Sequence, residues 1–372
     1  MKSIAVLYGG RSGEHEVSLI SASSILAYLD KDKYSIVPIG ITKRGEWFLQ
    51  HPPEWAYSRP ENGQMRSLPP VERSERVLAV PGEGLWLETT TKGLQKLNID
   101  VVFPVLHGTF GEDGTIQGLL ETVDLPYVGA DVLGSAVGMD KEVSKRLWLS
   151  AGLPVVDYIS VRKEDVSDEN LKILARKVET RFGWPCFVKP ACSGSSVGTS
   201  KVTHSEDLKD AILSALRWSE HALIEAFINA REIECAVLGN ERPMVFPPGE
   251  IVPSHEFYDY EAKYKDPQGA TLLIPAPLLE ETKNRIMSLA LSAYKYASVK
   301  GMARVDFFVE KITGEVFLNE INTIPGFTAI SMYPRMCIDA GVSYSELLDK
   351  LLELAIEQYA IKRELEYDFS KA

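Results

Sequence analysis

Four polar side chains near the C-terminal end of the sequence have the types and spacing of a metal site. "ARVDFF" places Arg304 and Asp306 two residues apart, and "NEINT" places Glu320 and Asn322 at the same spacing. Residues two apart on a β-strand point to the same face. Like charges opposite each other on paired strands are destabilising, and a divalent cation held by Asp306, Glu320 and Asn322 would offset the repulsion. Oxygen-only ligands suit Mg²⁺. The alternative is a solvated edge face on which Arg304 neutralises Asp306.

The segment "EKITGE" between these residues predicts a hairpin turn, because it contains a glycine between two strand-like runs. If Glu310 pairs with Val316, Asp306 faces Glu320 across the two strands. Simple alternation also places Leu318 on the face of Glu320.

A glycine-rich loop, "KPACSGSSVGTSKV", could hold phosphate groups. It lacks GK[ST] and a following helix, so it is not a P-loop. Its small side chains would let the backbone N–H groups of Ser195 and Ser196 approach an anion closely. Lys189 and Lys141 supply positive charge. The alternative is an ordinary glycine-rich hairpin turn.

Further candidates lie in two loops and one strand. "GGRSGEHEVSL" begins a helix near Glu14, which is either a first-turn acid that favours the helix or an acceptor for a substrate ammonium group. His107 ends a strand in "PVLHGTFGEDG", where it is either structural or faces a ligand. Glu225 and Glu232 bracket "EAFINARE" and could accept hydrogen bonds from adenine and ribose; taken alone they are exposed acids.

The composition is that of a globular protein with more than one domain. The chain has 372 residues, 45% hydrophobic and 25% charged, so two or three domains are expected. A net charge of -12 and a pI near 5.2 argue against a nucleic-acid binder. The four cysteines lack C-x-x-C spacing. The N-terminal residues predict a strand and not a signal peptide, and no apolar run is long enough to span a membrane. We expect a cytoplasmic protein.

The N-terminal part has a βαβ pattern. Strands are predicted at 3–8, 34–41 and 100–108, a helix at 17–29, and hairpins and loops at 51–95. The first region is therefore expected to be an open, largely parallel sheet with ligand groups at the ends of its strands.

Strands at 185–190 and 197–202 flank the glycine-rich loop, and a helix capped by Ser205 follows. The segment 253–277 is rich in tyrosine and has no clean period, and a loop of this length is usually functional. An amphipathic helix at 343–364 closes the chain.

Seven segments in order resemble the ATP-grasp carboxylate–amine ligases, and more closely the D-alanine–D-alanine ligase family: "GGRSGEHEVSL", "HGTFGEDGTIQG", "MDK", "KPACSGSSVG", "EFYDYEAKY", "ARVDFF" and "NEINTIPGFT". Only residues 51–95 fall outside the resemblance. It implies an α/β protein with a three-domain ATP-grasp architecture. These would be a Rossmann-like substrate domain with an open parallel sheet (1–135), a central domain (136–224) and a C-terminal domain with the metal site and lid (225–372).

The resemblance also implies roles for individual residues. Those of the nucleotide site would be Lys141, Lys189, Ser196, Glu225 and Glu232. Two Mg²⁺ ions, for which Mn²⁺ could substitute, would be held by Asp306, Glu320 and Asn322. The two amino-acid sites would include His107, Ser18, Lys263, Ser331 and Met332. The catalytic groups would be Glu14, Ser195, Tyr264, Arg304 and the backbone N–H of Gly326.

The implied reaction begins with attack of a D-alanine carboxylate on the γ-phosphate of ATP, which gives an acyl phosphate. The amine of a second D-alanine then attacks the acyl carbon, and Arg304 stabilises the oxyanion. A closing lid would keep water out. D-Serine or D-lactate could replace the second D-alanine, but Tyr264 in "EAKY" favours a peptide-forming enzyme and Met332 suits a methyl side chain. A homodimer is expected from the family, with no nucleic-acid or membrane partner.

Three other functions remain open from the residues. A dehydrogenase lacks the fingerprint glycines and leaves the metal residues unexplained. A nucleotide-binding regulator need not keep Arg304 with the metal residues. An ATP-grasp ligase for another carboxylate is the closest rival. Amino-acid-dependent ADP release separates these, because only a ligase couples ATP cleavage to an added amino acid.

Overall fold

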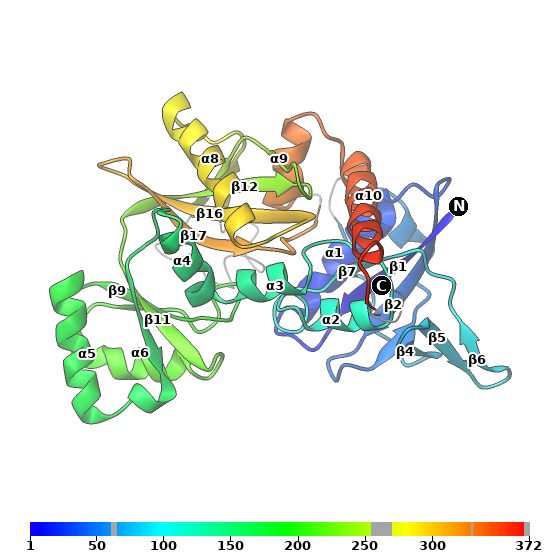
Figure 1. Cartoon of the computed structure of the whole chain (residues 1–372), viewed down its shortest axis with the longest axis horizontal. Helices are drawn as coiled ribbons and strands as arrows, with labels where there is room; N and C mark the ends of the chain where they lie inside the picture. Colours follow the sequence, from blue (N-terminus) through cyan, green and yellow to red (C-terminus); the bar gives the residue numbers. More distant parts are fainter. Residues whose placement is uncertain (61–64, 254–269, 329, 368–372) are drawn as a thin grey trace.

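A computed structural model describes residues 1–60, 65–253, 270–328 and 330–367. Its described strands form three sheets that follow one another along the chain (Figure 1). No helix of the described residues is long and apolar enough to cross a membrane. The α/β fold class is confirmed, whereas the predicted domain boundaries stay a prediction.

The first sheet is only partly parallel. Its strands are β1 (Lys2–Gly9), β2 (Tyr34–Ile41), β3 (Trp47–Leu49), β4 (Arg76–Val80), β5 (Gly84–Thr89), β6 (Gly93–Lys96) and β7 (Val101–Val105), in the order β6-β5-β4-β3-β2-β1-β7. β1 is parallel to β2 and β7, but β3 to β6 are antiparallel. The expectation of a largely parallel sheet is therefore wrong. The hairpins predicted in 51–95 are present, and their short turns dictate antiparallel pairing.

Helices cover this sheet and lead into the second one. They are α1 (His15–Tyr28), α2 (Thr115–Thr122), α3 (Val132–Met139) and α4 (Lys141–Ser150). Asp140 caps α4, accepting hydrogen bonds from the N–H groups of Glu142 at 2.9 Å and Val143 at 3.1 Å. This cap fixes the first turn of α4, which carries Lys141.

The second sheet is antiparallel, in the order β10-β9-β11-β8. Its elements are β8 (Tyr158–Arg162), α5 (Asp168–Arg181), β9 (Cys186–Pro190), β10 (Ser200–Val202), α6 (Leu208–Ala215) and β11 (His221–Ala226). The predicted cap at Ser205 is wrong. A 3-10 turn, Ser205–Asp207, precedes α6, and the Ser205 hydroxyl donates to Glu206 instead.

The third sheet carries the predicted hairpin. Its strands are β12 (Ala230–Leu238), β13 (Met244–Val245), β14 (Gly249–Pro253), β15 (Ala270–Leu273), β16 (Met302–Glu310) and β17 (Val316–Asn322), in the order β15-β14-β12-β16-β17 with β13 beside β12. Helix α8 (Glu280–Tyr296) packs against it (Figure 1).

A β-bulge corrects the predicted register of this hairpin. Asp306 does face Glu320, as predicted, but Val316 pairs with Val309 rather than with Glu310. The extra residue lies opposite the step from Asp306 to Phe307, and Asn319 has no partner in the ladder.

The bulge also changes which side chains share a face. Leu318 is fully buried in the same hydrophobic core as Ile321, so its predicted place beside Glu320 is wrong. The Asn319 side chain instead accepts a hydrogen bond from Lys189 of β9 at 3.0 Å. The bulge therefore adds a polar group to the side that carries Glu320.

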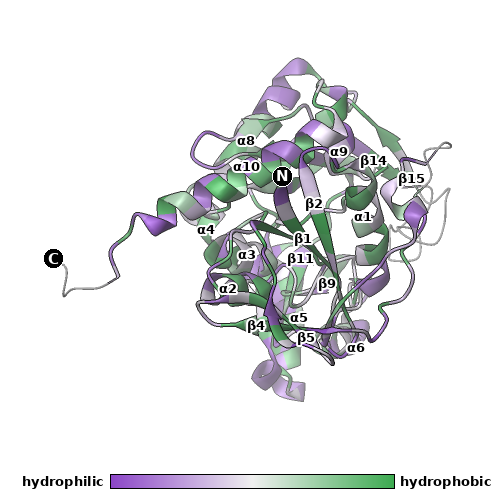
Figure 2. Ribbon diagram, turned by 90° about the vertical axis from the view of Figure 1, so that its right-hand side faces the viewer, coloured by the Kyte–Doolittle hydropathy of each residue, from purple (hydrophilic) through white to green (hydrophobic). Residues whose placement is uncertain are grey.

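The C-terminal helices α9 (Met332–Asp339) and α10 (Tyr344–Arg363) complete the core of the first sheet. Ser343 and Glu346 form a capping box at the start of α10. Phe327 lies between the first sheet and α10, with its ring centroid 5.9 Å from that of Phe103 and 5.7 Å from that of Tyr344. Figure 2 shows hydrophobic residues on β1 and α1 inside the molecule. The N-terminal and C-terminal parts thus share one core.

Candidate active site

Three lysines and two carboxylates meet where α4 packs between the second and third sheets. Nζ of Lys189 lies 2.7 Å from Oε2 of Glu225, and Nζ of Lys145 lies 3.1 Å from Oε1 of the same carboxylate. Nζ of Lys141 lies 3.0 Å from Oε2 of Glu320. The lysines outnumber the carboxylates, so this cluster favours an anionic ligand. Four of these residues are predicted from the sequence, and Lys145 is not.

Burial and pairing set the protonation of the cluster. Burial opposes ionisation of Glu225, but the charges of Lys145 and Lys189 outweigh it and hold the pKa of Glu225 below its usual value. Burial lowers the pKa of Lys145 to about 8, against the opposing charge of Glu225. For Lys141, burial is outweighed by the charge and hydrogen bond of Glu320, and the pKa is raised. Glu225 is therefore ionised and Lys141 cationic at neutral pH.

The glycine-rich loop between β9 and β10 is held close to Lys141. Nζ of Lys141 donates to the carbonyl of Ser193 at 2.7 Å, and its backbone N–H donates to that of Ala191 at 3.0 Å. Ser195 and Ser196 adopt φ values of 51° and 57°. Such left-handed conformations are uncommon for residues other than glycine and cluster at ligand sites. The loop is thus a shaped backbone segment with a cation beside it, as a phosphate site requires.

Glu14 connects the first sheet to this loop. It precedes α1, and its Oε1 accepts a hydrogen bond from the Ser195 hydroxyl. Its Oε2 lies close to two glycines. A Cβ added at Gly108 would lie 2.5 Å from this oxygen, and a Cβ added at Gly194 would lie 2.9 Å from it. Three loops therefore converge on one carboxylate, and glycine leaves room for it in two of them.

His107 follows β7 by two residues and is buried. Its ring nitrogens lie 3.0 Å from the Ser21 hydroxyl and 3.1 Å from the carbonyl of Ile324. Oε1 of Glu112, which the sequence analysis did not select, lies 3.5 Å from Nδ1. Burial alone would lower the pKa of His107, but the hydrogen bond and charge of Glu112 outweigh it and the pKa is raised. Burial also raises the pKa of Glu112, although its bond with His107 opposes the shift.

Ser18 joins three elements of the first sheet. It is fully buried, and its hydroxyl accepts from the N–H of Gly9 at 2.8 Å and donates to the carbonyl of Val105. These bonds fix the loop that precedes α1. A contact of Ser18 with a substrate stays a prediction.

Arg304 holds the carboxylates of the third sheet. Its Nε and Nη2 each donate to Asp306 at 2.7 Å, and Nε lies 3.0 Å from Oε2 of Glu234. Asn322 also donates to Asp306, at 2.9 Å. Glu234, which the sequence analysis did not select, pairs with Asp306 across β12 and β16, so it lines up with Asp306 and Glu320 on three adjacent strands. Arg304 therefore neutralises Asp306, but within the sheet and not on a solvated edge, since Asp306 is buried.

The predicted metal ligands offer oxygen donors only, which is the donor chemistry of a hard divalent cation. Within the described ranges, no group of three or more His, Cys, Asp or Glu side chains could hold a metal ion by itself. The residues fit a site that nucleotide phosphates would complete.

The loop after β17 is compact and anchored. The Ser331 hydroxyl accepts from the N–H of Thr328 at 3.1 Å, and a Cβ at Gly326 would lie 3.2 Å from that hydroxyl oxygen. Met332 is buried against Gly249, close to Ile274. Gly326 therefore lies next to Ser331, and Met332 follows Ser331 at the start of α9. Their predicted contacts with the reacting groups stay a prediction.

The remaining predicted site residues are Glu232, Lys263 and Tyr264. Glu232 lies half-buried on β12, opposite Ile251 of β14 and Phe308 of β16. Lys263 and Tyr264 fall outside the residues that the structure describes.

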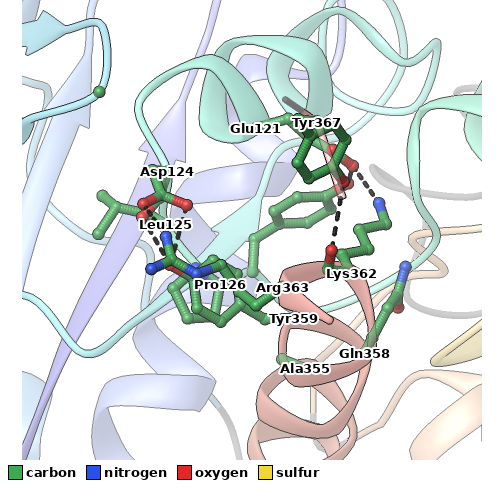
Figure 3. Close-up of a pocket in the computed structure, with 12 residues that line it drawn as sticks. Glu121, Asp124, Leu125, Pro126, Ala355, Gln358, Tyr359, Lys362, Arg363 and Tyr367 are labelled. Atoms are coloured by element: carbon green, nitrogen blue, oxygen red, sulfur yellow. Dashed lines mark hydrogen bonds and ion pairs between the residues drawn. The ribbon is translucent and has the colours of Figure 1, made fainter. Parts of the chain in front are cut away.

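A cavity of about 610 Å³ lies elsewhere, between the end of α2 and α10 (Figure 3). Its charged side chains pair with each other: Lys362 with Glu121, and Arg363 with Asp124 at 2.6 Å. It contains none of the predicted site residues, so we assign the chemistry to the clusters around Lys141 and Arg304.

Fold and site define the class of protein: an ATP-dependent ligase with the ATP-grasp architecture. The family model for the D-ala D-ala ligase N-terminus matches residues 3–130, and the model for its C-terminus matches residues 147–353. The chain belongs to the D-alanine–D-alanine ligase family. Membership implies the use of ATP and a divalent metal ion.

Relatives cover nearly the whole chain. The D-alanine--D-alanine ligase of Thermoanaerobacter sp. (strain X514) is 51% identical over 364 residues, covering 96% of this chain and 97% of its own length. That of Treponema denticola is 46% identical, with 98% of each chain covered. Among solved structures, the D-alanine-D-alanine ligase of Coxiella burnetii has a TM-score of 0.81 at 37% identity, covering 98% of this chain and 96% of its own. The VanG D-Ala:D-Ser ligase of Enterococcus faecalis has a TM-score of 0.79 at 36% identity, covering 95% and 99%.

Proposed function

We propose that the protein joins two D-alanines into D-alanyl-D-alanine, a precursor of peptidoglycan, with conversion of ATP to ADP and phosphate. The observation that carries this proposal is the convergence on Glu14. Its carboxylate contacts Ser195 of the phosphate loop and lies beside Gly108, next to His107. An amino acid whose ammonium group binds Glu14 would therefore lie next to the nucleotide phosphates.

In the first half-reaction the chain binds and orients. Lys141, Lys189 and the N–H groups of Ser195 and Ser196 hold the phosphates, while Glu225 and Glu232 take the adenine and ribose. Asp306, Glu320 and Asn322 would hold two Mg²⁺ ions, or Mn²⁺ in their place. When bound, the metal ions neutralise charge that develops during phosphoryl transfer.

In the second half-reaction the chain stabilises an oxyanion. The bonds of Arg304 with Asp306 and Glu234 use Nε and one N–H of Nη2. The two N–H groups of Nη1 have no role in these bonds. We assign Nη1 and the N–H of Gly326 to the tetrahedral oxygen, because preorganised donors need not reorient during the step. Ser331, Met332 and Lys263 take the second amino acid. Tyr264, with Ser195 and Glu14, closes the site. Ser18 positions the first amino-acid site through the loop before α1.

The second amino acid decides between close alternatives. A structural neighbour is a D-Ala:D-Ser ligase, so the fold alone does not separate D-alanine from D-serine. The buried thioether of Met332 favours a methyl side chain. A homodimer and a cytoplasmic location stay predictions.

The test is phosphate release with ATP and Mg²⁺ in the presence of D-alanine, L-alanine, D-serine, or D-alanine plus D-lactate, with the products identified by mass. Release with D-alanine alone, yielding the dipeptide, is the expected result. Release only with D-serine or D-lactate present would overturn the acceptor. No release with any of them would overturn the proposed reaction.

A further inference from the structure

Lys145 is a charged residue of the site that no step above uses. Its side chain is 0% exposed, although lysine is almost never fully buried unless it is paired. It lies one helical turn after Lys141 on α4 and faces inward, toward Glu225 on β11. The charged groups that act on it are Glu225, Lys189 and Glu320.

The two lysines on Glu225 differ in what else they can reach. Lys189 is 11% exposed, bonds to Asn319 as well, and precedes the glycine-rich loop directly. The ammonium group of Lys189 can therefore leave Glu225 and bind a phosphate oxygen instead. Nζ of Lys145 is enclosed, and its one described ion pair is with Glu225. Lys145 cannot reach a phosphate without leaving its buried place.

This difference matters when a nucleotide binds. Glu225 is almost fully buried, and a buried carboxylate that loses its counter-ion tends to take up a proton. A protonated Glu225 is a poor acceptor for the 6-amino group of adenine. If Lys189 moves from Glu225 to the phosphates, Oε2 of Glu225 loses its partner and can accept another hydrogen bond. Lys145 is then the cation that keeps Glu225 ionised.

We propose that Lys145 is a positioning residue for adenine recognition: it fixes Oε1 of Glu225 as a charged group, so that Oε2 can accept the adenine amino group once Lys189 moves to the phosphates. The inference rests on the proposed role of Glu225 and assigns no contact between Lys145 and the nucleotide.

The test compares the affinities for ADP and IDP, measured by calorimetry with Mg²⁺ on the full chain. IDP carries a 6-oxo group in place of the amino group, so the ratio of the two affinities reports on this one hydrogen bond. Lys145→Met should lower the ADP:IDP affinity ratio about 10-fold, because the adenine amino group loses a charged acceptor, whereas a protonated Glu225 can donate to the 6-oxo group of IDP. Lys209→Met is the matched control, since Lys209 forms an exposed ion pair with Asp168 in the same part of the chain.

A double-variant comparison separates positioning from a general structural effect. If Lys145 acts through Glu225, adding Lys145→Met to Glu225→Gln should leave the ADP:IDP ratio within about twofold of Glu225→Gln alone. If Lys145→Met alone does not fold, the double variant, which has neither buried charge, can be compared with Glu225→Gln by the same ADP:IDP affinity ratio. An unchanged ADP:IDP ratio in Lys145→Met, equal losses for both nucleotides, or a further loss in the double variant would each overturn the inference.

Binding is measured without an amino acid, so the result stands apart from the ligase reaction. Failure of D-alanine-dependent phosphate release would contradict the proposed function, whereas the ADP:IDP ratio would still test Lys145.

Discussion

The position of the Glu14 carboxylate depends on a missing side chain at Gly194, and Gly194→Ala tests that dependence. A Cβ there would lie 2.9 Å from Oε2 of Glu14, whereas ordinary contact begins near 3.4 Å. The carboxylate must therefore move by about 0.5 Å, judged from those two distances. The clash is with the end of a flexible side chain, so the fold should tolerate it.

The kinetic effect should be larger than the effect on stability. A misplacement of about 1 Å can cost about 10²-fold in rate, so half of that distance should cost about 10-fold in kcat/KM for D-alanine. A 10-fold loss corresponds to about 1.4 kcal/mol of transition-state stabilisation. The KM for ATP should change less than about twofold, because Glu14 contacts the loop through Oε1, which would lie at an ordinary contact distance of 3.7 Å from the added Cβ.

The assay is phosphate release at varied D-alanine and saturating ATP, with a thermal melt of each protein. Gly13→Ala is the matched control: it adds the same methyl group beside Glu14, but a Cβ there meets nothing within 4 Å. If Gly194→Ala retained the kcat/KM of Gly13→Ala, the carboxylate of Glu14 would not be a positioned ligand for the amino acid.

Three further predictions concern the metal side, the pH dependence and the packing of α4. Glu320→Gln should abolish turnover and leave the melting temperature nearly unchanged, whereas retained turnover with normal Mg²⁺ dependence would contradict the metal assignment. The raised pKa of His107 means that its stabilising contribution is complete below its unfolded pKa of about 6.5 and is lost as pH rises through the folded value. The difference in unfolding free energy between wild type and His107→Gln, measured in urea across that pH range, should therefore decrease as the pH rises. An increase of this difference with pH would contradict the prediction. Trp148→Phe removes a buried donor 3.1 Å from the Ala293 carbonyl and should cost about 1–3 kcal/mol in urea unfolding. Trp218→Phe, at an exposed site, should cost less than about 0.5 kcal/mol, and equal costs would contradict the account.

The hairpin of β16 and β17 shows what alternation in a sequence can and cannot predict. The two-residue spacing and the glycine turn were enough to place Asp306 opposite Glu320. They could not locate the extra residue, because a bulge depends on packing across the sheet as well as on local pattern. One signal was present: strict alternation would have left Leu318, a large apolar side chain, on the polar face of Glu320. Burying Leu318 beside Ile321 requires the bulge.

The residues missed in the site had only weak local signals in the sequence. Lys145 lies in the helical segment "DKEVSKRLW", where a lysine is more often solvated than buried. Its partner Glu225 is distant in sequence, and only the packing of α4 against β11 brings the two together. The spacing of four residues from Lys141 was the available signal, because it places both lysines on one face of a helix. Glu234 follows Glu232 at strand spacing and could have been selected in the same way.

The charges of the site divide into two parts, and Glu320 belongs to both. It pairs with Lys141 at 3.0 Å and lies opposite Asp306 on the neighbouring strand. Among the described side chains, Lys145 and Lys189 share the single carboxylate of Glu225, whereas Asp306 and Glu234 share the single guanidinium of Arg304. A nucleotide that carries its own cations can satisfy both sides in one orientation only, with phosphates toward the lysines and metal ions toward the carboxylates. A cation that bound Glu320 would free the charge of Lys141 for the phosphates, so the proposed metal and nucleotide sites would strengthen each other through this one carboxylate.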